Sequence, residues 1–109
     1  MTPALYLLQR GTAALLVPLV FTHLVLIVLA VQGGLTAEEI LARTSGSVGW
    51  ALFYGVFVLA AAIHAGIGLQ AILAEWTGLG RRGAAVFGHV FMLVLVVLGL
   101  RAVWAVVAA

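Results

Sequence analysis

Three long stretches of the sequence contain almost no charged side chain. They cover about residues 11–31, 48–74 and 84–107. Each is longer than the roughly 20 apolar residues that an α-helix needs to cross about 30 Å of hydrocarbon. The sequence therefore predicts an all-α integral membrane protein with three transmembrane helices. We expect residues 1–109 to form a single transmembrane domain that belongs to a larger helical bundle.

The composition excludes several other classes of protein. Hydrophobic residues make up 66% of the chain and charged residues only 7%, whereas a soluble domain carries about 25% charged residues. Five basic and three acidic side chains do not make the clustered basic surface that nucleic-acid binding requires. Without cysteine, the chain has no disulfide, no thiolate ligand and no attachment point for c-type haem. Any flavin or iron–sulfur domain is expected on a partner, because only short loops lie outside the helices.

The few charges predict how the chain crosses the membrane. Arg10 precedes the first apolar stretch, and Arg81 and Arg82 lie between the second and the third. Cytoplasmic loops carry an excess of arginine and lysine. We therefore expect the amino terminus and the second loop on the cytoplasmic side of the cell inner membrane. The first loop and the carboxyl terminus are expected outside.

The first loop is predicted to contain a short helix, over about residues 36–43. Thr36 followed by Glu39 is typical of a capping box at a helix start. Leu35, Ile40 and Leu41 give this helix one apolar face, so we expect it to lie on the membrane surface. Ser47 is the expected cap of the second transmembrane helix.

Three histidines, His23, His64 and His89, lie one in each apolar stretch. An ionisable side chain at membrane depth is costly unless it is paired or bound, so each is a candidate for a functional site. Around His64, Ala60 and Gly68 lie one helical turn away on nearly the same face. Small neighbours leave room for a haem ligated by His64, and close helix packing explains the same small residues equally well.

Other candidates lie at the expected cytoplasmic boundary. Glu75 follows His64 by eleven residues and therefore returns to the same helix face about 16 Å away. Glu75 and the adjacent Trp76 are candidates for a quinone site, although acidic and tryptophan residues are also common at any membrane interface. Arg10 and Thr12 are candidates at the start of the first helix.

The other two histidines have different expected depths. His23 lies about 20 Å beyond Arg10, so it is expected near mid-membrane with His64, where the two could approach one iron from opposite sides. Pro18 can kink the helix before His23 and leaves its direction open. His89 lies only about 10 Å from the boundary. It is a candidate for quinone or haem-propionate contact, and helix packing beside Gly88 is the favoured alternative.

Two segments resemble signatures of one membrane-protein family. Residues 9–19, QRGTAALLVPL, look like the first helix of the small membrane-anchor subunits of succinate dehydrogenase and fumarate reductase. In these anchors an arginine is followed by a threonine–alanine or serine–glycine pair. The second segment has His64, then Gly68 and then Glu75, similar to the histidine, glycine and acidic residue of the same anchors. Larger anchors carry arginine and histidine at Gln70 and Ala71, so the chain looks closer to the smaller anchor.

The resemblance implies roles for individual residues. His64 matches the axial ligand of haem b, and Arg10 matches an arginine near the haem propionates and the quinone pocket. Glu75 and Trp76 match an aspartate–tyrosine pair at the quinone site. Trp76 offers an N–H donor in place of a phenol, which changes the geometry of any hydrogen bond to quinone.

The resemblance also implies an activity shared with partner chains. In the family a flavoprotein oxidises succinate or reduces fumarate, and an iron–sulfur subunit passes electrons to ubiquinone or menaquinone at the anchor. Three residues could provide the second haem ligand: a histidine of a different anchor subunit, His23 of this chain, or the equivalent histidine of a second copy of the chain. We prefer a second chain, because three helices enclose a haem poorly. The alternatives are a haem-free structural subunit and a b-type cytochrome anchor of another dehydrogenase.

Overall fold

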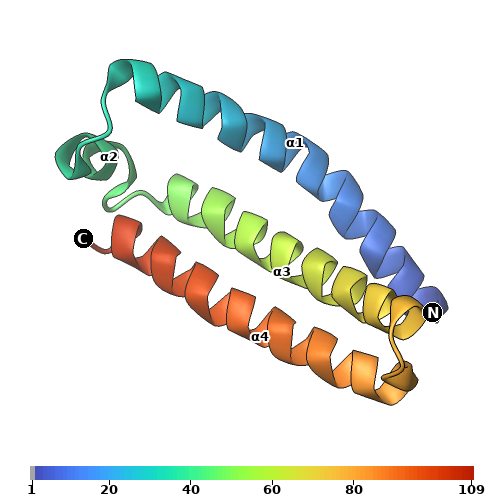
Figure 1. The fold of residues 1–109 in the computed structure, drawn as a ribbon. Helices are drawn as coiled ribbons and strands as arrows, with labels where there is room; N and C mark the ends of the chain where they lie inside the picture. Colours follow the sequence, from blue (N-terminus) through green and yellow to red (C-terminus); the bar gives the residue numbers. More distant parts are fainter. Residues whose placement is uncertain (1) are drawn as a thin grey trace.

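The computed structural model describes residues 2–109, and this part of the chain is entirely helical apart from short connections. The helices are α1 (Pro3–Gly33), α2 (Ala37–Thr44), α3 (Val48–Trp76) and α4 (Gly80–Val107). Helices α1, α3 and α4 are long and apolar enough to cross a membrane. Helices α3 and α4 run side by side, and α1 lies on the other side of α3 from α4 (Figure 1); the longest extent of the molecule is 48 Å. That length is close to the roughly 40–45 Å of a bilayer with its head groups. The all-α class and the three spans are therefore confirmed.

Helix α1 begins eight residues earlier than the apolar stretch indicated. Thr2 is its N-cap and accepts a hydrogen bond from the backbone N–H of Leu5 at 3.2 Å, and Pro3 follows at the first helical position. Proline is favoured there because its fixed φ suits a helix and its missing N–H would have no partner. Arg10 therefore lies within α1 and does not precede it. Helix α1 continues unbroken through Pro18.

The predicted short helix is α2, and both expected caps are present. The Thr36 hydroxyl accepts from the N–H of Glu39, and the Ser47 hydroxyl accepts from the N–H of Trp50. Helix α2 contacts the end of α4 through Thr44, which is almost fully buried. The Thr44 hydroxyl lies 2.7 Å from the carbonyl of Val106. This contact fixes the first loop against the carboxyl-terminal end of the chain.

Helices α3 and α4 pack closely because glycines face one another. A Cβ atom on Gly88 would lie 2.7 Å from the carbonyl oxygen of Gly66, which is too close for any real side chain. Ala62 and Ala84, which are 1% and 0% exposed, extend this contact with small side chains. Small residues let membrane helices approach closely and gain van der Waals contact. The α3–α4 pair is therefore the tightest part of the bundle.

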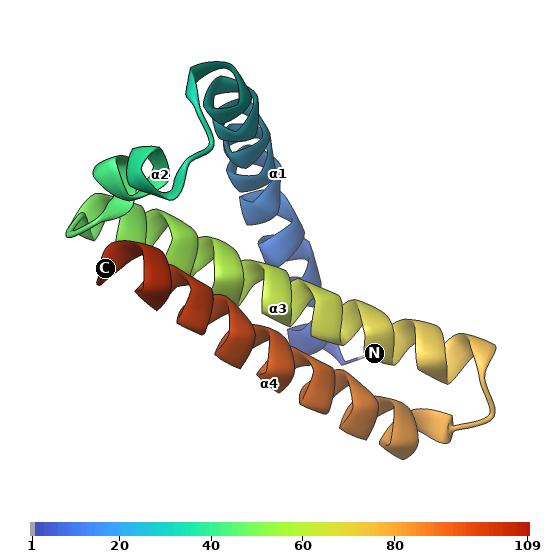
Figure 2. The ribbon, with the colours of Figure 1, turned by 60° about the vertical axis from the view of Figure 1, so that its left-hand side comes forward.

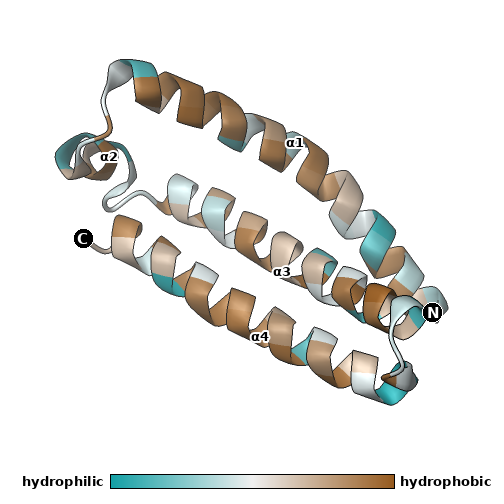
Figure 3. Ribbon diagram, viewed as in Figure 1, coloured by the Kyte–Doolittle hydropathy of each residue, from teal (hydrophilic) through white to brown (hydrophobic). Residues whose placement is uncertain are grey.

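Helix α1 packs against α3 and then leaves it. Its amino-terminal half lies near the carboxyl-terminal half of α3, and its carboxyl-terminal end swings away from the α3–α4 pair (Figure 2). Hydrophobic residues cover the middle of all three long helices, with hydrophilic residues mostly toward their ends (Figure 3). Large apolar side chains such as Phe21 and Leu93 are exposed, as expected for surfaces that face lipid.

Candidate functional site

A polar contact joins α1 to α3 beside one of the three histidines. The Thr12 hydroxyl oxygen lies 3.4 Å from Nδ1 of His64. Thr12 is only 9% exposed, the most buried position described in α1. The sequence placed Thr12 at the membrane edge. Because α1 begins at Pro3, Thr12 lies well inside the helix and at the level of His64.

Gly68 lies against the same helix. A Cβ atom on Gly68 would be 3.4 Å from Nε2 of Gln9, so the space beside this glycine is taken by α1. The other amide atom of Gln9, Oε1, is buried and has no hydrogen-bond partner in the described part of the chain. At this distance an added methyl group would only touch Gln9, so α1 lies beside Gly68 without requiring glycine there. Gln9, Thr12 and His64 together form a polar layer between α1 and α3. The sequence analysis missed Gln9 because a single glutamine near a helix end belongs to no recognisable pattern.

The second ring nitrogen of His64 is available to a ligand. No side chain or backbone group of residues 2–109 hydrogen-bonds to His64 Nε2. This nitrogen is also not one of the buried side-chain atoms that lack a partner, so it is accessible from outside the described residues. Haem iron binds a neutral imidazole nitrogen as axial ligand, so this donor fits a haem. A bare metal ion has no such site here, since no group of three histidine or acidic side chains converges within residues 2–109.

His23 occupies a different level of the bundle. Its ring packs edge-on against Phe57 and Tyr54, at centroid distances of 5.2 and 6.1 Å. Phe57 precedes His64 by seven residues, which is about 10 Å along α3. The Nδ1 atom of His23 is buried without a partner among the described residues. His23 also lines an apolar pocket of about 370 Å³ that extends to α4 at Gly99.

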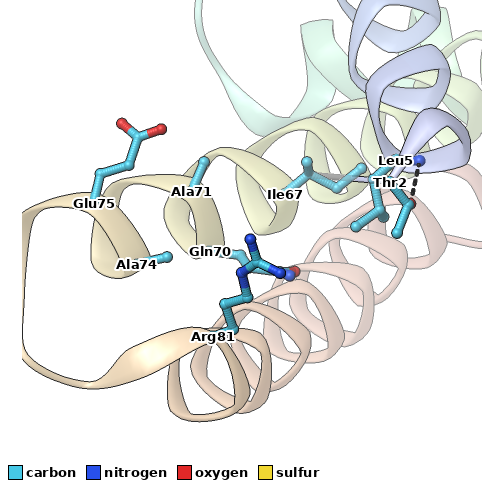
Figure 4. Close-up of a pocket in the computed structure, with 8 residues that line it drawn as sticks. All are labelled: Thr2, Leu5, Ile67, Gln70, Ala71, Ala74, Glu75 and Arg81. Carbon is cyan, nitrogen blue, oxygen red and sulfur yellow. Dashed lines mark hydrogen bonds between the residues drawn. The ribbon is translucent and has the colours of Figure 1, made fainter.

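A larger pocket of about 520 Å³ lies at the other end of the bundle, where α1 begins and α3 turns into α4. Its volume is in the usual range for small-molecule sites. The lining residues are Thr2, Leu5, Ile67, Gln70, Ala71, Ala74, Glu75 and Arg81. The side chain of Arg81 reaches over Gln70, while the Glu75 carboxylate points away from both (Figure 4). The pocket thus combines apolar walls with hydrogen-bond donors and one carboxylate.

Of the five residues predicted for a quinone site, Glu75 alone lines this pocket. Arg10 is exposed and its guanidinium lies 5.8 Å from the ring centre of Tyr6. Trp76 is 81% exposed. His89 is exposed on α4, and its Nδ1 lies 2.6 Å from the carbonyl oxygen of Ala85. Thr12 contacts His64, as described above.

Arg81 and Gln70 are pocket residues that the sequence did not single out. Arg81 was used only to orient the chain, and Gln70 only to compare anchor types. Arg81 lies at the start of α4, next to the α3–α4 connection, whereas Gln70 lies inside α3, six residues before its end. Which turn residues point into a pocket depends on how the helices pack, and this is not visible in the sequence.

Together these features define a small multi-pass membrane protein with a histidine between two spans and a polar pocket at one end. The model of the succinate dehydrogenase/fumarate reductase transmembrane subunit family matches residues 1–97. The chain belongs to this family, which confirms the resemblance seen in the two sequence signatures. It is thus a membrane subunit of a multi-subunit complex. No curated protein and no solved structure gives a significant match.

Proposed function

We propose that the chain anchors succinate dehydrogenase or fumarate reductase and passes electrons between a partner iron–sulfur subunit and quinone, with haem b bound at His64. The imidazole of His64 carries this proposal: Nδ1 faces a buried hydroxyl, and Nε2 has no hydrogen-bond partner among residues 2–109. A histidine inside a membrane is costly unless it binds something. When bound, haem supplies a one-electron carrier within the membrane.

The second axial ligand is proposed to come from another chain. His23 lies beside Phe57, which is about 10 Å from His64 along α3, and its ring packs edge-on against Phe57. A haem between His23 and His64 would have to displace these contacts. A different anchor subunit or a second copy of this chain can instead approach Nε2 of His64 from outside the bundle. Arg10, two residues before Thr12 and exposed, is the proposed partner of a haem propionate.

Quinone is proposed to bind in the pocket of about 520 Å³ between α1, α3 and α4. Reduction of a quinone to a quinol consumes electrons and protons in equal number. Arg81 and Gln70 offer N–H donors to a quinone carbonyl, and exposed Glu75 can carry protons between water and the pocket. Ubiquinone and menaquinone both fit this chemistry.

The dicarboxylate reaction is assigned to partners. A flavoprotein would convert succinate and fumarate, and the iron–sulfur subunit would dock at the pocket end of the anchor. The pocket end of the anchor carries three arginines, Arg10 near the start of α1 and Arg81 and Arg82 at the start of α4. By the positive-inside rule this end faces the cytoplasm. The proposed location is the cell inner membrane, with the amino terminus in the cytoplasm.

Purification of the intact complex through a tag on this chain tests the proposal. Under mild detergent we expect the flavoprotein and the iron–sulfur subunit to accompany the chain, with a b-type band in the reduced-minus-oxidised spectrum. Absence of both partners contradicts the anchor function. A complete complex that reduces quinone but contains no haem contradicts the haem assignment alone.

A haem-free structural subunit is the second candidate. The observation that favours it is the contact between Gly68 and Gln9, because α1 occupies the face that a haem against His64 would share. In that case His64 and Thr12 would serve only to join two helices through a polar contact. The same difference spectrum separates the two candidates.

A further inference from the structure

The hydroxyl of Thr12 has two kinds of neighbour. Its oxygen lies 2.7 Å from the carbonyl oxygen of Leu8 and 3.1 Å from that of Gln9, one turn back in α1. On its other side it lies 3.4 Å from Nδ1 of His64. A carbonyl oxygen can only accept a hydrogen bond, whereas a neutral imidazole nitrogen can donate or accept.

These distances assign the hydroxyl proton. Threonine in a helix commonly donates to the carbonyl one turn back, and the Leu8 carbonyl is the nearest acceptor. With its single proton directed there, the Thr12 oxygen can only accept from His64. The contact is then a hydrogen bond only if Nδ1 of His64 carries the proton. The unprotonated nitrogen, with its lone pair, is therefore Nε2.

We propose that Thr12 is a positioning residue that holds His64 in the Nδ1-protonated tautomer, so that Nε2 is presented to haem iron. This inference rests on the proposed haem function. A metal-bound histidine that donates its other N–H is held in orientation and becomes a stronger electron donor. Stronger donation stabilises ferric iron, so Thr12 lowers the midpoint potential of the haem and raises its retention.

Thr12→Val is the informative substitution, because valine keeps the β-branched shape and lacks the hydroxyl. We expect the assembled complex to lose haem affinity by about 10- to 100-fold and its remaining haem to show a higher midpoint potential. Thr12→Ser should restore both, since serine keeps the acceptor. Thr22→Val, at an exposed threonine of the same helix, is the matched control and should resemble the unmodified complex.

The measurements are haem content per complex, from the reduced-minus-oxidised spectrum, and the midpoint potential, from redox titration. Gel electrophoresis of the native complex confirms that each variant assembles. Unchanged haem content and potential in Thr12→Val overturn the inference, as does equal loss in Thr12→Val and Thr12→Ser. His64→Ala distinguishes failure of the role of Thr12 from failure of His64 as the haem ligand. If it removes haem while Thr12→Val changes nothing, only the role of Thr12 fails; if haem survives it, the proposed ligand fails as well.

Discussion

Replacing Gly88 with alanine tests the closest approach in the bundle. The new Cβ atom would lie 2.7 Å from the Gly66 carbonyl oxygen and 2.9 Å from Cβ of Gln70, whereas ordinary contacts begin at 3.4 Å. Helices α3 and α4 must therefore separate by about 0.7 Å. A gap of this size removes about a quarter to a half of the dispersion energy of the contacts that it opens. Overpacking of this kind costs about 1–3 kcal/mol.

Gly55→Ala is the control, because a Cβ atom at Gly55 in α3 has open space around it. Alanine also favours a helix over glycine by about 1 kcal/mol, so the comparison of two Gly→Ala changes cancels this gain. The assay is the free energy of unfolding in mixed micelles as the fraction of dodecyl sulfate rises. We expect Gly88→Ala to be less stable than Gly55→Ala by about 1–3 kcal/mol. Equal stability of the two variants would refute the close packing of α3 against α4.

Four further substitutions follow from the contacts described. Thr44→Val removes the hydroxyl by which the almost fully buried Thr44 donates to the carbonyl of Val106, and it should lower the free energy of unfolding by about 1–3 kcal/mol in the same assay. In quinone-reductase assays of the complex, Arg81→Gln should raise the KM for quinone about 10-fold, as a lost charge-assisted hydrogen bond would. Glu75→Gln should lower kcat about 100-fold, because Glu75 is the proposed proton carrier. An unchanged KM in Arg81→Gln together with an unchanged kcat in Glu75→Gln would exclude this pocket as the quinone site. His23→Ala should keep the b-type band, and loss of the band would indicate ligation within one chain.

Much of the fold was predictable because a bilayer permits few structures. The length of the apolar stretches fixed the number of spans, and hydroxyl residues at helix starts indicated the caps at Thr36 and Ser47. Both signals are local, and each depends on the chain's own backbone groups. The start of α1 was misplaced because Gln9 and Arg10 interrupt the apolar run that begins at Ala4, whereas the helix start is set by the Thr2 cap and Pro3.

The arrangement of the site was less predictable, since it depends on contacts between helices. His64 stood out because a histidine in an apolar stretch is rare. Its neighbour Thr12 is 52 residues away, and the contact depends on the early start of α1 and on how α1 packs against α3. The pocket residue Arg81 was equally hidden, because only the packed turn between α3 and α4 points it towards Gln70.

The most direct test of the central claim is the difference spectrum of the assembled complex carrying His64→Ala, compared with the complex carrying His89→Ala. His89 is exposed, and its Nδ1 already has the Ala85 carbonyl as a partner, so its loss leaves the α1–α3 layer intact. We predict that His64→Ala abolishes the b-type band while the flavoprotein and iron–sulfur subunit still co-purify, and that His89→Ala keeps the band. A full b-type band in His64→Ala would contradict the account.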